Sequence, residues 1–236
     1  MPETIRSRIE AVRQRIQTAA QRCGRDPGEI TLIAVSKTYS AADVDAAAAC
    51  GIRDFGENKV QELIKKQPET AEGLNWHLIG HLQTNKARSV VGKVCLIHSV
   101  DSMHLAEEID RRAASQGIVQ EVLLQVNAAG EETKFGVPEE ELVPLAEGIA
   151  EKLVNVRIRG LMQIAPYAED TEEVRVWFRR MRLLREELKR RGFEGADILS
   201  MGMSHDFETA IEEGATHIRV GTAIFGARNY NTAVQK

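Results

Sequence analysis

The sequence has few cysteines, and they are not arranged as in a cross-linked or metal-bound framework. Its three cysteines, Cys23, Cys50 and Cys95, are widely spaced and form no C-x-x-C pair. A disulfide-stapled scaffold uses an even number of cysteines, and a zinc site needs closely spaced ligands. The pattern argues against both and predicts a protein of the reducing cytoplasm.

Long apolar runs and basic blocks are also missing. No stretch of about 18 apolar residues exists to cross a membrane. Residues 1–21 alternate charge with small and branched apolar residues and so do not resemble a signal peptide. The net charge is −4, and the arginines of residues 175–191 are interleaved with apolar residues as on an amphipathic helix. We therefore expect neither a membrane nor a nucleic-acid partner.

No Pro/Gly-rich linker or low-complexity segment divides the chain, and strand-like runs alternate with helical patterns after a leading helix at about Thr4–Cys23. The predicted strands are Leu32–Val35, Ile52–Phe55, Trp76–Ile79, Leu96–Ser99, Val122–Val126, Ile158–Met162, Asp197–Ser200 and His217–Val220. The predicted helices between them are Ala41–Cys50, Asn58–Gln67, a short one at Thr84–Val91, Met103–Ser115, Glu139–Lys152, Thr171–Arg191 and Asp206–Glu213.

This alternation favours a parallel sheet, and about eight βα units in 236 residues are what a (β/α)₈ barrel needs. An open doubly wound sheet is the alternative, but a dinucleotide-binding one would carry a Gly-rich turn after its first strand. Ser36–Ser40 follows that strand and contains no glycine. The sequence thus predicts an α/β protein, a single-domain (β/α)₈ TIM barrel over residues 1–236 with an extra N-terminal helix.

Lys37 ends the first predicted strand, at the face of the barrel where active sites form. Desolvation at such a rim favours the neutral amine, which attacks a carbonyl to form a Schiff base. By itself, a lysine in this place is more often one that ends a strand and extends to water.

Ser204, Gly221 and Thr222 follow the seventh and eighth predicted strands, where barrels commonly bind phosphate. Ser204 is also expected to be the N-cap of the helix that begins near Asp206, and Thr222 to open a short C-terminal turn. A structural role would explain each residue by itself without a ligand, but their combination on neighbouring strands predicts an anion site.

Arg219 lies within the apolar eighth strand, so its side chain needs a buried partner. A salt bridge to Asp197 or Glu57 is the ordinary alternative to a role as donor toward a bound ring. His77 and His81 do not sit on the helix that an H-E-x-x-H metal site requires, so we expect a core histidine and a polar strand-end residue. Tyr39 is placed to cover whatever Lys37 holds, or is an ordinary surface tyrosine.

Seven segments together resemble the YggS/PROSC family of pyridoxal 5′-phosphate (PLP) homeostasis proteins, which is related to the barrel domain of alanine racemases. The resemblance covers essentially the whole chain in the same order. The segments are Ile33–Lys37, Phe55–Asn58, Trp76–Lys86, His98–Asp101, Gly160–Met162, Met201–Ser204 and Arg219–Gly226.

The resemblance implies a role for each matching residue. Lys37 would hold PLP as an internal aldimine, and Arg219 would face the pyridine nitrogen. The phosphate would be bound by Ser204, Gly221 and Thr222. Asn58, His81 and Met162 would line the cofactor pocket. Lys134 falls where the racemases carry an arginine, which leaves its role open.

The family also implies cofactor supply rather than catalysis: a PLP carrier or buffer that influences amino-acid and keto-acid metabolism, with apo PLP-dependent enzymes as further partners. Arg219 would leave the ring nitrogen unprotonated and the ring a poor electron sink. The racemases share this arginine but add a second β-domain that supplies a tyrosine base, for which we expect no room in this chain. We expect no substantial turnover and a monomer.

Two alternatives remain open from the sequence. The first is a slow PLP-dependent racemase or lyase, with His81 and Tyr39 as the candidate acid and base. The second is a Schiff-base aldolase or sugar-phosphate isomerase that uses Lys37 and the anion site without a cofactor.

Overall fold

The computed structural model, which describes residues 4–131 and 133–226, contains a closed barrel of parallel strands. Each strand pairs with the next along the chain, and β8 returns to pair with β1, with Ala34 beside Val220. The strands are β1 (Thr31–Val35), β2 (Asp54–Glu57), β3 (Asn75–Leu78), β4 (Leu96–Val100), β5 (Gln120–Gln125), β6 (Val156–Met162), β7 (Ile198–Met203) and β8 (His217–Val220). The predicted (β/α)₈ barrel is confirmed.

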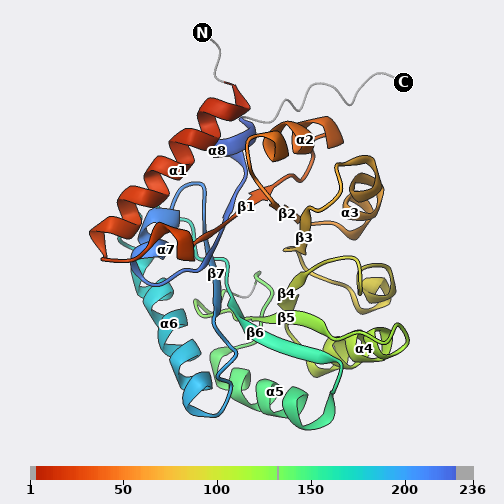
Figure 1. Ribbon diagram of the computed structural model, residues 1–236. Helices are drawn as coiled ribbons and strands as arrows, with labels where there is room; N and C mark the ends of the chain where they lie inside the picture. The colour runs from red at the N-terminus through yellow and green to blue at the C-terminus, as the bar shows by residue number, and fades with distance from the viewer. Residues whose placement is uncertain (1–3, 132, 227–236) are drawn as a thin grey trace.

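Helices surround this barrel (Figure 1). They are α1 (Ile5–Arg22), α2 (Ala41–Ala49), α3 (Val60–Lys66), α4 (Met103–Ala114), α5 (Glu139–Lys152), α6 (Arg175–Arg190), α7 (Phe207–Glu212) and α8 (Thr222–Phe225). Short 3₁₀ helices lie at Pro27–Glu29, Gln67–Glu69 and Thr84–Ser89.

Several predicted elements have other bounds in the structure: the helix predicted from Thr171 begins at Arg175, and the strand predicted to end at Ser200 continues to Met203. The strand predicted at Ile52–Phe55 is shifted, because Gly51 takes a left-handed φ of 83° and the N–H groups of Gly51 and Ile52 donate to carbonyls of α2. This C-cap uses Ile52, so pairing begins at Asp54. The segment predicted as a helix at Thr84–Val91 is a 3₁₀ helix over Thr84–Ser89.

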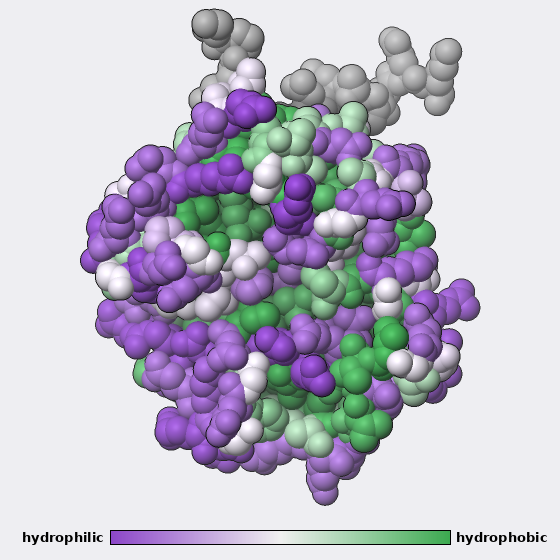
Figure 2. Space-filling view, viewed as in Figure 1, coloured by the Kyte–Doolittle hydropathy of each residue, from purple (hydrophilic) through white to green (hydrophobic). Residues whose placement is uncertain are grey.

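The extra N-terminal helix α1 begins with a capping box in which Thr4 and Ser7 exchange hydrogen bonds. Its inner side buries Ile9, Val12 and Ile16, each of which contributes roughly 1.5–3 kcal/mol of apolar burial. The helix packs beside α7 and α8. Figure 2 shows that its outward side is hydrophilic. Among the described residues, no helix has the length and apolarity needed to span a membrane.

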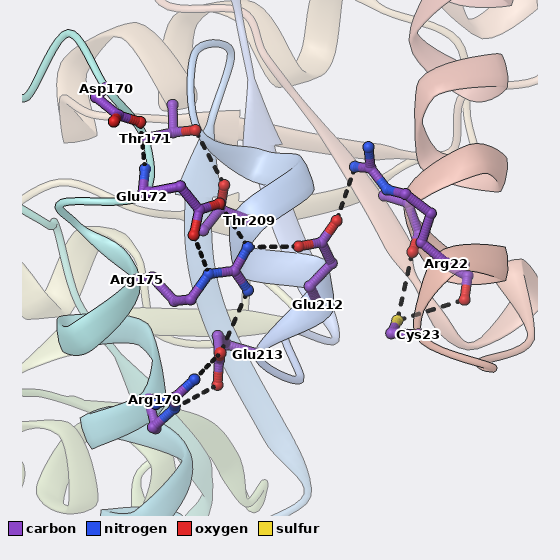
Figure 3. A network of polar contacts seen from close by, with 12 residues as sticks. Arg22, Cys23, Asp170, Thr171, Glu172, Arg175, Arg179, Thr209, Glu212 and Glu213 are labelled. Carbon is purple, nitrogen blue, oxygen red and sulfur yellow. Dashed lines mark hydrogen bonds and ion pairs between the residues drawn. The ribbon is translucent and has the colours of Figure 1, made fainter.

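A network of ion pairs joins α6, α7 and α1 on the outside of the barrel (Figure 3). Arg175 of α6 contacts Glu212 at 2.6 Å and Glu213 at 3.3 Å, and Arg22 of α1 contacts Glu212 at 2.7 Å. Burial raises the pKa of Glu213, but hydrogen bonds from Arg179 and Arg175 outweigh it, so the pKa is lowered. The network fixes α7, and with it the loop that carries Ser204.

Candidate functional site

A cavity of about 260 Å³ lies at the carboxyl ends of the strands. Six of the eight site residues predicted from the sequence line it: Lys37, Asn58, Ser204, Arg219, Gly221 and Thr222. A more voluminous hollow, about 520 Å³, lies at the opposite end, beside Arg13 and Asp54. We place the site in the smaller cavity because it alone of the two combines an amine, a buried guanidinium and two hydroxyls.

Lys37 lies in the turn that follows β1, where its side chain is half-buried. The next residue, Thr38, has φ 71° and is the sole residue other than glycine with a positive φ in the described part of the chain. A β-branched residue is strained in this region. The Glu62 carboxylate accepts a hydrogen bond from the Thr38 N–H at 2.9 Å. The direction in which Lys37 leaves the barrel is therefore set by a strained, anchored turn.

A buried ion pair lies beside this turn. The Lys66 ammonium contacts the Glu57 carboxylate and also donates to the Ser36 carbonyl at 2.7 Å. The Ser36 hydroxyl donates to the same Glu57 oxygen at 2.7 Å. Burial raises the pKa of Glu57, against the hydrogen bonds from Lys66 and Ser36. The pair joins α3 to the ends of β1 and β2, and nothing in the sequence pattern predicts it.

Contrary to the prediction from the sequence, Ser204 does not cap α7. Its Oγ accepts a hydrogen bond from the Gly221 N–H at 3.2 Å, whereas the N-cap position of α7 is Asp206. The Asp206 carboxylate accepts from the Met203 N–H at 2.6 Å and closes the turn itself. The prediction that Ser204 caps the helix was wrong, because the turn places Ser204 toward the β8 loop. Thr222 does begin a short helix, α8.

Two side chains hold α8 in place against the barrel. Arg8 of α1 donates to the carbonyls of Ile224 at 2.8 Å and Phe225 at 3.2 Å. Tyr39 stacks on Phe225 with ring centroids 4.6 Å apart, and its hydroxyl donates to the Gly226 carbonyl at 2.8 Å. Tyr39 is not among the residues lining the cavity. Both contacts fix the loop that carries Gly221 and Thr222.

Arg219 is buried, with 4% of its surface exposed. Its guanidinium donates to the Ser200 hydroxyl and to the Gln163 carbonyl, both at 2.8 Å. The predicted alternative, a salt bridge from Arg219 to Glu57 or Asp197, was wrong. Glu57 pairs with Lys66, and Asp197 pairs with Lys189. Burial lowers the pKa of Arg219 to about 10, with Asp206 acting in the opposite direction. The group therefore remains a cation at neutral pH.

His81 and Met162, also predicted to be site residues, are absent from the cavity lining. His81 stacks on Phe135, with ring centroids 3.8 Å apart, and lies 3.5 Å from the Asp101 carboxylate. Met162 is fully buried and packs against Leu96 and Leu123 inside the barrel.

Lys134 and His77 also lie outside the cavity lining. Lys134 contacts Glu131 at 2.6 Å and the Ala165 carbonyl at 3.1 Å, and thus joins two loops. His77 is a hydrogen-bonded core histidine, as expected. Within residues 4–131 and 133–226, no cluster of three or more His, Cys, Asp or Glu side chains is arranged to hold a metal ion.

The cavity's polar groups are those that a phosphorylated aldehyde on an aromatic ring requires. Lys37 offers an amine for the aldehyde, and Arg219 offers N–H donors for a ring acceptor. Because the Ser204 Oγ accepts from Gly221, its own proton has no acceptor among the described residues and is available to an anionic oxygen. Val35, Ile79 and other apolar residues complete the walls.

The fold and the site define an alanine racemase-type barrel, and the family described as alanine racemase, N-terminal domain, matches residues 8–229. A pyridoxal phosphate homeostasis protein of Aquifex aeolicus is 50% identical over 94% of this chain and 98% of its own length. One of Pseudomonas aeruginosa is 46% identical over 96% and 97%. The chain belongs to the family of pyridoxal phosphate homeostasis proteins.

A solved structure of this kind shares the fold closely. PipY of Synechococcus elongatus, solved with PLP bound, superposes with a TM-score of 0.84 at 40% identity, over 94% of this chain and 100% of that one.

Proposed function

We propose that this protein binds PLP through a Schiff base to Lys37 and acts in PLP homeostasis as a carrier or buffer. The observation that carries the proposal is the meeting of Lys37, Arg219 and Ser204 in one cavity, in a chain whose relative PipY was solved with PLP bound. Lys37 would hold the aldehyde carbon, and Ser204, Gly221 and Thr222 the phosphate. Asn58 would line the pocket. His81 and Met162 would support it from outside the cavity lining.

The residues around the site favour storage over turnover. When bound, PLP supplies an electron sink, and that sink is strongest when the ring nitrogen is protonated. Arg219 donates hydrogen bonds but releases no proton at neutral pH, so it would keep that nitrogen neutral. The candidate acid and base, His81 and Tyr39, are stacked on Phe135 and Phe225 instead. We infer that the protein exchanges cofactor and does not transform amino acids at enzymatic rates.

The proposal also includes the protein's partners, its oligomeric state and its cellular compartment. A carrier would deliver PLP to apo PLP-dependent enzymes and act as a monomer. The free cysteines Cys23, Cys50 and Cys95 support a reducing cytoplasm.

The test is to locate the covalent adduct. The purified protein is incubated with PLP, reduced with borohydride, digested and analysed by mass spectrometry. We expect a pyridoxyl group on Lys37, with none on that peptide in Lys37→Ala and full labelling in Lys59→Ala, which removes an exposed amine next to Asn58. Wild-type protein that stays colourless and unmodified in excess PLP would overturn the proposal and favour a cofactor-free Schiff-base enzyme.

A second measurement tests storage against turnover. The loaded protein is mixed with L-alanine or D-alanine, and the enantiomers are separated over time. We expect no interconversion at enzymatic rates, commonly about 1–1000 per second. Rapid racemisation would contradict the carrier role and leave PLP binding intact.

A further inference from the structure

A chain of hydrogen bonds between side chains crosses the interior of the barrel and ends at Arg219. The Arg219 Nη1 donates to the Ser200 Oγ at 2.8 Å, and that oxygen lies 3.0 Å from the His98 Nδ1. The His98 Nε2 lies 3.0 Å from the His77 Nδ1, and the His77 Nε2 lies 3.1 Å from Asp54. The chain thus connects β8, β7, β4, β3 and β2.

The Asp54 carboxylate, which only accepts, sets the direction of the chain when each imidazole carries a single proton. Arginine only donates, so the Ser200 oxygen accepts from Arg219, and when the His98 proton is on Nε2 the Ser200 proton goes to the His98 Nδ1. His98 then carries its proton on Nε2 and donates it to the His77 Nδ1. His77 in turn carries its proton on Nε2 and donates it to the Asp54 carboxylate. Each imidazole has one proton and is neutral in this order.

The surroundings of His98 favour this neutral form. His98 and Ser200 are fully buried, and His77 and Arg219 are almost so. Burial lowers the pKa of His98 well below its usual value, and the nearby His77, Arg219 and His217 lower it further. At the far end, burial raises the pKa of Asp54, but the interactions with His77 and Asn75 together outweigh burial, so the pKa is lowered. An ionised acceptor therefore terminates the chain.

We propose that Ser200 and His98 are positioning residues, which hold the Arg219 guanidinium in the plane needed to meet the ring of a cofactor bound at Lys37. The proposal rests on the proposed function and adds residues that do not line the cavity. The Gln163 carbonyl holds Nη2 and Ser200 holds Nη1, so two anchors fix the orientation of the guanidinium. Because arginine releases no proton at neutral pH, the chain orients Arg219 and does not conduct protons through it.

The hydrogen-bond order is tested directly by long-range ¹H–¹⁵N NMR of the imidazole rings in the full-length protein, with and without PLP. We expect His98 and His77 as neutral Nε2–H tautomers in both states. A proton on the His98 Nδ1 would overturn the order and with it the proposal. This readout needs no bound cofactor.

The positioning role is tested by Ser200→Ala, with Ser99→Ala as the matched control. Ser99 is a buried serine next to His98 whose hydroxyl has no partner among the described residues. Loss of a hydrogen bond to a charged group predicts PLP binding weaker by on the order of tenfold in Ser200→Ala, with a shifted absorption maximum of the bound cofactor. Ser99→Ala should keep both properties, and Ser200→Thr, which retains the hydroxyl, should recover the absorption maximum.

The outcomes separate the two proposals. If the wild type is labelled at Lys37 and Ser200→Ala keeps its affinity and spectrum, the positioning role is wrong and the PLP assignment remains. If the wild type takes no label, the PLP assignment is wrong and the positioning role falls with it. A Ser200→Ala protein with a lowered melting temperature but unchanged spectrum and affinity would show a purely structural role.

Discussion

The Ser204 hydroxyl accepts a hydrogen bond from the Gly221 N–H at 3.2 Å and so joins the loops that follow β7 and β8. The residues are 17 positions apart in the chain and line the same cavity. The contact orients the hydroxyl so that its proton is available for a ligand. One hydrogen bond therefore both joins the two loops and leaves a donor for an anion.

Ser204→Ala should reduce the preference for a phosphorylated ligand. The variant loses the hydroxyl donor but keeps Lys37, so binding of PLP should weaken by on the order of tenfold, and binding of pyridoxal should change little. Titrations of both aldehydes, followed by absorbance, measure the two affinities. An equal loss for both ligands would place Ser204 outside the phosphate site.

Thr38→Gly should make the protein more stable. Relief of the left-handed strain is worth about 1–2 kcal/mol, and the added freedom of glycine in the unfolded chain costs about 0.5–1 kcal/mol. Thr38 is exposed, so little packing is lost. Urea unfolding measures the difference, and Thr18→Gly in the exposed face of α1 should have the opposite sign. A destabilised Thr38→Gly would show that the side chain itself is needed.

Lys66→Met should destabilise the fold by about 3–5 kcal/mol, because it leaves the buried Glu57 carboxylate without its cation. The double variant Lys66→Met/Glu57→Gln should recover part of this loss. Lys65→Met, at the exposed neighbouring position of α3, is the control and should have little effect. Chemical denaturation measures the free energy of unfolding of the wild type and the three variants. A Lys66→Met protein as stable as the wild type would contradict the predicted loss.

Acid should destabilise the protein in part through His217. Burial lowers the pKa of His217 from 6.5 to about 4, with the nearby His77 acting in the same direction. Between these two values the unfolded chain binds a proton that the folded protein excludes, so stability is full above pH 6.5 and falls toward pH 4 by about 3 kcal/mol. His217→Gln should flatten this part of a plot of unfolding free energy against pH. An unchanged slope would assign the acid sensitivity to other groups.

The fold was largely predictable because the strand order follows the chain. Apolar runs and amphipathic helices alternate, and a right-handed crossover leaves few other closed arrangements. The errors lie at element ends, where local contacts decide: Ile52 belongs to the cap of α2, and Asp206 replaces Ser204 at the start of α7. Both errors depend on which backbone N–H and C=O groups are hydrogen-bonded in a turn. The spacing of apolar residues along the sequence carries no such information.

The site was predictable where strand ends supply it. Lys37, Ser204 and Thr222 come directly from the pattern of polar residues after apolar runs, and they line one cavity together with Arg219, which the sequence places within an apolar strand. His81 and Met162 follow strands in the same way, yet one turns to Phe135 and the other into the barrel. The direction of each side chain depends on packing between strands distant in the sequence.

The sequence by itself determined the alternation of strands and helices, because hydrophobic period reflects which face each element buries. It also determined that a lysine and a serine follow two of the strands and that an arginine lies within a third. Only the tertiary structure decided their partners: Glu57 with Lys66, and Arg219 with Ser200, which continues to His98. Closing the barrel brings these residues within hydrogen-bond distance, and a buried polar group must then take whichever partner the register places beside it.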